Sequence, residues 1–212
     1  MNFYALTKEK YMLDLRINRL KVVVVFFILM AFSVSGYADG IEDSIKEALQ
    51  YYVDGDYKDA VESLNYASQL IQQKKGKGLE SFLPKPLKGW TGQKSTSQAA
   101  GAAMFGGGVT AQREYSKGSS SITVQIITDS PLMQGMMMMF ANPMFATSDG
   151  GKLEKIGRQK AIVKFNTDNK QGEIKIVVAN RFLVLIEGDD VTKEALKGYA
   201  KAINYKKLKA ME

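Results

Sequence analysis

Alternating apolar and polar positions mark the second half of the chain as β-structure. Runs in which β-branched or aromatic residues occupy every other position are typical of half-buried strands, and short polar or glycine-containing breaks between them are typical of hairpin turns. The predicted strands are 110–117, 120–129, 152–157, 158–166, 172–179 and 181–188. Because consecutive hairpins build antiparallel sheets, this region predicts a largely antiparallel sheet.

A helical period replaces this alternation at both ends of the sheet region. From Ile41 to about Lys74, apolar and aromatic residues recur every three or four positions, with a break at DGDY (54–57), which predicts two helices joined by a turn. Residues 190–203 predict an amphipathic helix capped by Asp190 or Thr192. The expected fold class is therefore α+β: a helical hairpin followed by a largely antiparallel sheet with helices packed on one face.

The N-terminal hairpin has a specific residue pattern. Two helices can approach closely at the small residues Ala48, Ala60 and Ala67. Gly55 turns the chain, and the aromatic residues Tyr51 and Tyr57 fill the wedge between the helices, with Leu64 as the large position of the pattern. In this pattern the segment resembles a single tetratricopeptide-type helical hairpin, with Gln72 where such a repeat usually ends in Pro. One repeat cannot bury both of its faces, so the resemblance implies packing on the rest of the protein or on a partner.

Composition divides the chain into four segments. We expect a signal peptide at 1–38, the helical hairpin at 39–75, a linker and lead-in at 76–91, and an α+β domain at 92–212. The basic, glycine-containing stretch QQKKGKG (72–78) is typical of a linker, and it overlaps the start of the 76–91 segment. The glycine-rich region 91–108 predicts a mobile loop or a weak edge strand, and Trp90 is expected to anchor the core or its edge.

Two resemblances concern the second half and the chain as a whole. A stretch LP…GW (83–90), an early hairpin with an Arg-containing strand, a helix, a meander and a final helix resemble the element order of small PsbP-like α+β domains. The chain is also similar to uncharacterised secreted proteins of Gram-negative bacteria with LP…GW, AGAAMFGGG, NPMFA and GRQKAIVKF segments. Neither resemblance implies an activity, since a fold does not fix a function.

The N-terminus predicts export. Five basic residues precede the apolar run 22–36, and Gly36 and Ala38 place small residues at the −3 and −1 positions of a cleavage site after Ala38. The run is shorter than the roughly 20 residues of a spanning helix, which favours a cleaved signal and a periplasmic location over an uncleaved anchor. Translation from Met12 instead of Met1 would give a shorter basic region. Removal of 1–38, with five basic and two acidic residues, lowers the net charge from +7 to +4.

The absence of cysteine and histidine narrows the chemistry. It excludes disulfides, thiol nucleophiles, imidazole acid–base catalysis and zinc sites built on these residues. Carboxylates and lysines are the remaining acid–base candidates, but they show no recognisable pairing: Asp129, Lys160, Lys164, Glu187, Asp189 and Asp190. No basic and aromatic interleaving typical of nucleic-acid binding is present, and no cofactor is expected.

The segment PLMQGMMMMFANPMFA (131–146) is the most unusual stretch. It predicts a helix capped by Asp129 or Ser130 and interrupted near Pro143. The expected core stripe is Leu132, Met133, Met136, Met139, Phe140 and Met144. Three interpretations stay open: core packing, an exposed partner-binding face with Met137 and Met138 outward, and Cu(I) binding through the soft thioethers of Met133, Met136 and Met137.

These observations predict a secreted, non-enzymatic binding or accessory protein that acts through protein–protein contacts, with periplasmic Cu(I) handling as the alternative. The expected partner is another envelope protein, with weak contact between the basic C-terminal lysines and an anionic membrane surface as an addition. The candidate partner-binding residues are Tyr51, Tyr52, Met136, Met137, Met138 and Met139.

Overall fold

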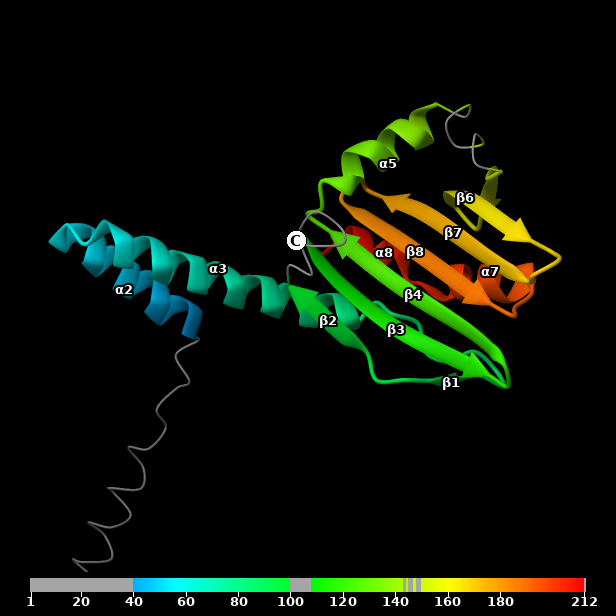
Figure 1. The fold of residues 1–212 in the computed structure, drawn as a ribbon, viewed down its shortest axis with the longest axis horizontal. Coiled ribbons are helices and arrows are strands. Elements are labelled where there is room, and N and C mark those ends of the chain that lie inside the picture. The colour runs from blue at the N-terminus through cyan, green and yellow to red at the C-terminus, as the bar shows by residue number, and fades with distance from the viewer. Residues whose placement is uncertain (1–39, 100–107, 143, 145–146, 148–149, 212) are drawn as a thin grey trace, which may run out of the picture.

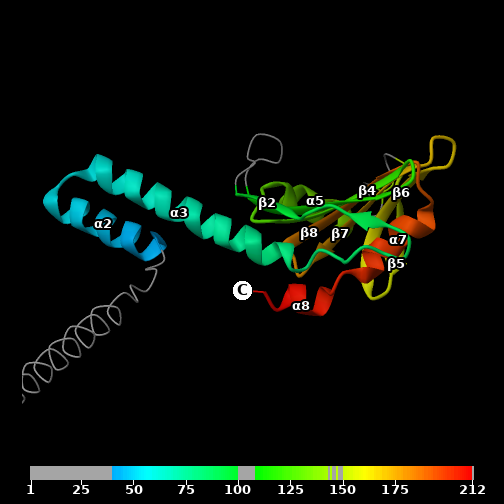
Figure 2. The ribbon, with the colours of Figure 1, turned by 90° about the horizontal axis from the view of Figure 1, so that it is seen from below.

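The computed structural model describes residues 40–99, 108–142, 144, 147 and 150–211. The expected signal peptide and the glycine-rich residues 100–107 lie outside these ranges. Two long helices project from a twisted sheet along the longest axis of the molecule (Figures 1 and 2). The α+β fold class predicted from the sequence is confirmed, with two N-terminal helices followed by an eight-stranded antiparallel sheet. None of the described helices is long and apolar enough to cross a membrane.

The projecting part is a hairpin of helices α2 (Gly40–Asp54) and α3 (Tyr57–Glu80). The turn between them depends on Gly55, whose φ of +86° lies in the left-handed region that glycine adopts without steric cost. The two helices meet along a seam of small side chains, namely Ser44, Ala48, Ala60 and Ala67, all of them buried. Small residues at a helix interface let the backbones approach closely, so the predicted helix pair forms with little large apolar area in its seam.

The expectation that 72–78 is a linker is wrong, because α3 continues without a break to Glu80 and so includes the first five residues of the expected 76–91 segment. Tertiary contacts outweigh the poor helix propensity of glycine here. A Cβ atom at Gly76 would lie 3.0 Å from the Cβ of Ser97, so this glycine allows the helix to pack closely on strand β2 (Thr96–Ala99). Leu79 in the last turn is fully buried in the core, and Lys75 pairs with Asp129 at the end of the sheet. The hairpin is therefore joined to the sheet by a continuous helix.

The sheet has the strand order β1-β3-β4-β8-β7-β6-β5, with β2 paired to β3, and every pairing is antiparallel. Its strands are β1 (Thr91–Gly92), β2, β3 (Val109–Lys117), β4 (Ser120–Thr128), β5 (Lys152–Ile156), β6 (Gln159–Asn166), β7 (Gln171–Val178) and β8 (Phe182–Asp189). The predicted hairpins β3–β4 and β7–β8 are confirmed. In the glycine-rich region, the short strand β2 matches the weak edge strand that was expected.

One face of the sheet carries the main core, covered by α7 (Lys193–Ala202) and α8 (Tyr205–Lys209). Thr192 caps α7 by accepting a hydrogen bond from the amide of Ala195, which decides between the two expected caps. Two glycines that are paired across strands β7 and β8 leave room for this helix. A Cβ at Gly172 would lie 2.7 Å, and one at Gly188 would lie 2.8 Å, from a methyl group of the buried Leu196. Trp90 packs edge-on against Tyr199 at the border of this core, as predicted for an anchor.

The basic C-terminal tail forms the helix α8, which the sequence pattern did not predict. Leu208 is fully buried in the main core, and the hydroxyl of Tyr205 donates a hydrogen bond to the carbonyl of Ala200 at 2.7 Å. Lys206, Lys207 and Lys209 remain exposed. Two large side chains thus hold the tail against the fold while its lysines face solvent.

The methionine-rich helix α5 (Leu132–Ala141) lies on the opposite face from α7 and α8 (Figure 2), so the expectation that the helices pack on one face of the sheet is wrong for α5. Met133 is buried against Ile127 and Leu183, and Met136 packs beside them. Ser130 accepts a hydrogen bond from the amide of Leu132 at 3.3 Å. The expected core stripe is only partly right, because Leu132 and Met144 are 42% and 77% exposed. The helix rests on one end of the sheet, so only its first turns have a sheet surface to cover.

Candidate functional site

The hairpin carries most of the exposed large apolar surface of the described residues. Nine of thirteen exposed large apolar side chains lie on α2 and α3. Seven of them form what we call the apolar face, made of Ile45, Leu49, Tyr52, Tyr57, Val61, Leu64 and Ile71, each 46–65% exposed. Monomeric proteins rarely expose contiguous apolar patches larger than a few hundred Å², so a concentration of this kind is a candidate interaction surface.

Helical geometry places these residues on one side of the hairpin. Along α3, Tyr57, Val61, Leu64, Ser68 and Ile71 follow alternating four- and three-residue steps, which form one stripe beside the buried seam. Along α2, the same spacing lines up Ile45, Leu49 and Tyr52. The stripes meet at the turn, where the rings of Tyr52 and Tyr57 lie 5.8 Å apart between centroids. The apolar face is therefore continuous across both helices.

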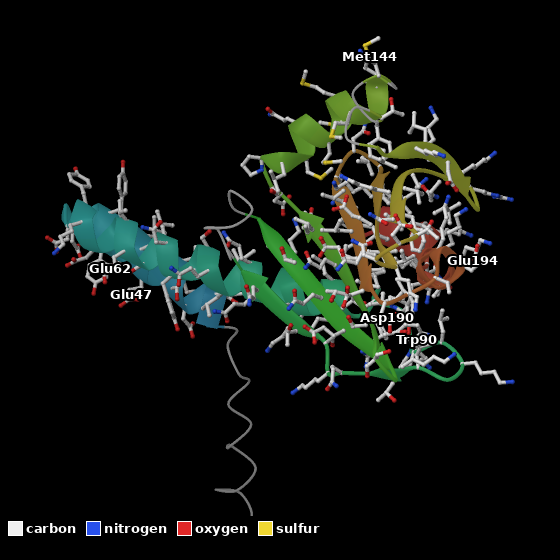
Figure 3. All side chains as sticks on the ribbon, turned by 45° about the vertical axis from the view of Figure 1, so that its right-hand side comes forward. Glu47, Glu62, Trp90, Met144, Asp190 and Glu194 are labelled. Atoms are coloured by element: carbon white, nitrogen blue, oxygen red, sulfur yellow. The ribbon has the colours of Figure 1, made fainter. Side chains whose placement is uncertain are left out.

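The other side of the hairpin is acidic. A shallow hollow of about 430 Å³ is lined by Glu47, Tyr51, Asp59, Glu62, Ser63 and Tyr66. Glu47 and Glu62 lie next to each other along this side (Figure 3). The negative charge of Glu47 raises the pKa of the Tyr51 hydroxyl. The segment 40–71, which makes up the outer part of the hairpin, holds seven acidic and two basic residues and has a net charge of −5. It thus presents two chemically distinct faces.

The structure separates the two tyrosines that the sequence placed together as candidates. Tyr52 is 63% exposed on the apolar face, whereas Tyr51 lines the acidic hollow. Adjacent helix positions point about 100° apart, which explains the separation. Sequence reasoning missed the other six members of this surface as binding candidates: Ile45, Leu49, Tyr57, Val61, Leu64 and Ile71. A second stripe beside the alanine seam was the signal that could have found them.

The four candidate methionines lie on α5, away from the hairpin (Figure 1). Met138 is 65% exposed, and Met136, Met137 and Met139 are half-buried. The structure therefore does not join these methionines and Tyr52 into one surface. Of the three expected Cu(I) ligands, Met133 is occupied in packing against Ile127 and Leu183. The described residues also contain no group of three or more acidic side chains that could hold a metal ion.

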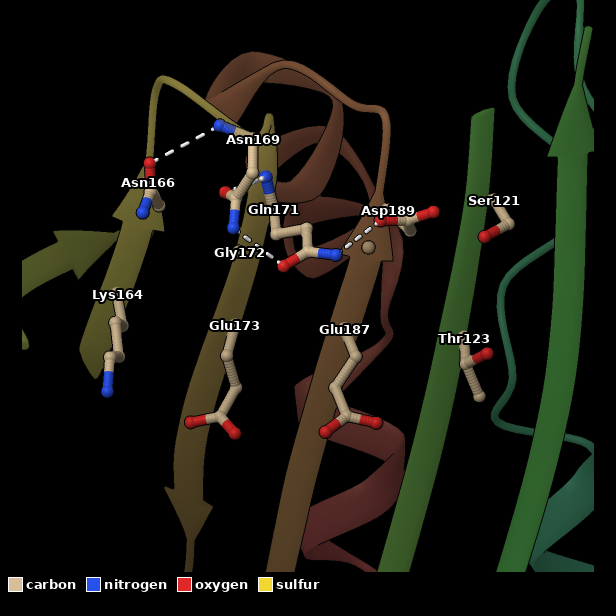
Figure 4. Close-up of a pocket in the computed structure, with 11 residues that line it drawn as sticks. Ser121, Thr123, Lys164, Asn166, Asn169, Gln171, Gly172, Glu173, Glu187 and Asp189 are labelled. Carbon is tan, nitrogen blue, oxygen red and sulfur yellow. Dashed lines mark hydrogen bonds between the residues drawn. The ribbon is translucent and has the colours of Figure 1, made fainter. Parts of the chain in front are cut away.

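A polar hollow of about 670 Å³ covers the other end of the sheet face on which α5 rests (Figure 4). It is lined by Ser121, Thr123, Lys164, Asn166, Asn169, Gln171, Gly172, Glu173, Glu187, Gly188 and Asp189. Glu173 and Glu187 are direct partners in the β7–β8 register, and Figure 4 shows both side chains on this face. Partial burial, and then the charge of Glu173, raise the pKa of Glu187. Sequence reasoning named Glu187 but missed Glu173, although hairpin register about the three-residue turn 179–181 pairs them.

The other acid–base candidates have structural partners or lie apart. Asp129 pairs with Lys75 at the base of the hairpin. Hydrogen bonds from Ser119 and then Lys170 lower the pKa of Asp190, which follows strand β8. Asp189 accepts a hydrogen bond from Gln171 at 2.6 Å, while Lys164 stands at the rim of the polar hollow. These contacts hold turns and strand ends together and assemble no nucleophile with an activating base among the described residues.

Comparison of the chain with protein-family models, with curated proteins and with solved structures finds no significant match. The structure defines an α+β protein with a projecting helical hairpin, whose exposed apolar face is its most distinctive surface.

Proposed function

We propose that this protein is a non-enzymatic binding or accessory protein of the cell envelope, and that it binds a protein partner through the apolar face of its hairpin. The observation that carries the proposal is the exposure of seven large uncharged side chains on one side of a helix pair. Burial of apolar area drives most protein association, and aromatic anchors such as Tyr52 and Tyr57 are enriched in binding hot spots. The envelope location rests on the export signal expected in 1–38.

The way the hairpin is attached supports a binding role. Leu79 and Leu83 fix the base of α3 in the main core, and the carboxylate of Glu80 accepts hydrogen bonds from Ser95 and Ser97 at 2.6 and 2.7 Å. These hydrogen bonds lower the pKa of Glu80. A surface held on an anchored helix loses little conformational freedom on binding, which lowers the entropic cost of association.

Site-specific photocrosslinking in cells tests this proposal. A photoreactive residue at Tyr52 is expected to give a discrete protein adduct, because its ring is 63% exposed where the two stripes of the apolar face meet. The matched control is Tyr66, which is 56% exposed on the same hairpin but lines the acidic hollow. A third probe at Met138 covers the α5 surface. Adducts from Met138 alone would move the binding surface to α5, and the absence of adducts from Tyr52 would refute the proposal.

A further inference from the structure

We propose that the occupant of the apolar face is a second copy of this chain, and that two hairpins pack into an antiparallel four-helix bundle. The inference rests on the proposed function and names its partner. A two-helix hairpin with one apolar face is half of such a bundle, and two-fold symmetry closes it without leaving an open end. The alternating three- and four-residue spacing of the stripe on α3 is the pattern that packs helices at a shallow crossing angle.

The size of the face fits a stable dimer. Its seven side chains are 46–65% exposed. With roughly 200 Å² for each fully exposed residue, the face offers on the order of 800 Å² to a partner. This is about the area that one partner contributes to a standard-size protein interface. The helix pair alone buries mainly serine and alanine in its seam, so a second hairpin would supply the large apolar core that the first one lacks.

The charge distribution selects this face for self-association. An isologous interface brings the same patch of both copies together, so any charge in the patch would lie close to a charge of the same sign on the other copy. All seven residues of the apolar face are uncharged, whereas the opposite side holds Glu47, Asp59 and Glu62. Pairing through the apolar face leaves the two acidic sides pointing outward. The net charge of −5 on segment 40–71 of each copy still opposes association at low salt, and dissolved salt screens this repulsion.

Sedimentation velocity of the purified protein tests the inference. We expect a monomer–dimer equilibrium with a Kd of about 1–10 µM, at the weak end of the range for an interface of this size, because the acidic hairpins repel each other. Leu64→Glu should raise the Kd at least about tenfold, because each dimer would bury two new carboxylates. The matched control Tyr66→Glu changes a residue of similar exposure, 56% against 53%, on the acidic side and should leave the Kd unchanged. Circular dichroism verifies that both variants keep their helices.

Salt dependence and crosslinking separate a second copy from other partners. Raising salt from about 50 to 500 mM should strengthen the dimer, whereas binding of a basic partner to an acidic hairpin would weaken. A photocrosslinker at Leu64 in the otherwise unchanged chain should give an adduct of twice the chain mass. A monomer at about 100 µM, or equal effects of Leu64→Glu and Tyr66→Glu, would overturn the inference. An adduct with a different protein from a monomeric chain would overturn it as well, while leaving the proposed function intact.

Discussion

Two leucines on the same helix provide a direct test of how the hairpin is built. Leu79 is fully buried where α3 enters the main core, whereas Leu64 is 53% exposed on the apolar face. Changing each to alanine removes the same atoms from two different environments. For Leu79→Ala, the lost burial of about three carbon groups plus a residual cavity gives an expected loss of about 3 kcal/mol in the free energy of unfolding. For Leu64→Ala in the monomer, the expected change is within about 0.5 kcal/mol.

Urea unfolding followed by circular dichroism measures both values. Because self-association adds stability that depends on concentration, the comparison is made at sub-micromolar protein, where the chain is expected to be monomeric. Leu79→Ala should lower the urea midpoint clearly, and Leu64→Ala should not. At higher concentration Leu64→Ala should lose the extra stability that dimer formation gives to the unchanged protein. Equal destabilisation by the two variants at low concentration would show that the apolar face is buried within one chain, which contradicts the reasoning.

Three further predictions follow from packing and charge. Gly188→Ala should lower the free energy of unfolding by about 1–3 kcal/mol in denaturant titrations, because the added Cβ would meet Leu196 and Val191 at 2.8 and 2.7 Å. The control Gly118→Ala should lose less, because its added Cβ meets no atom within 4 Å and its cost is backbone strain at a φ of +60°. Glu154 accepts hydrogen bonds from Lys193 and then Lys197, which lower the pKa of its carboxyl group. The resulting stabilisation of about 1 kcal/mol is present above the ordinary pKa of 4.5 and is lost as pH falls through the lowered pKa of the folded protein. Glu154→Gln should therefore flatten the pH dependence of the urea midpoint in that acidic range. The pKa of Glu187 is raised, so ionisation of its carboxyl group costs folding stability as pH rises above the ordinary value of 4.5. Glu187→Gln should therefore raise the melting temperature at pH 7 but not at pH 3. An equal gain at both pH values would contradict this cause.

The local pattern of the sequence determined most of the secondary structure. Period-two alternation located β3 with β4 and β7 with β8, since a strand with one buried face must alternate. The alanine seam and Gly55 located the helix pair for the same kind of reason: close helix approach needs small residues, and the turn needs a left-handed backbone. Thr192 as a helix cap is likewise a local effect, because its hydroxyl reaches an amide three residues away.

Only the tertiary structure decided where these elements have surfaces to cover. The polar stretch 72–78 is helical because Gly76 packs on Ser97 and Leu79 enters a core made by distant strands. Glu173 faces Glu187, and glycines seat Leu196, because strand register brings together residues far apart in the chain. The apolar stripe of the hairpin is equally readable as core or as surface from sequence alone, since periodicity reports that one side is apolar but not what covers it. The projection of α3 away from the sheet leaves that side exposed to solvent.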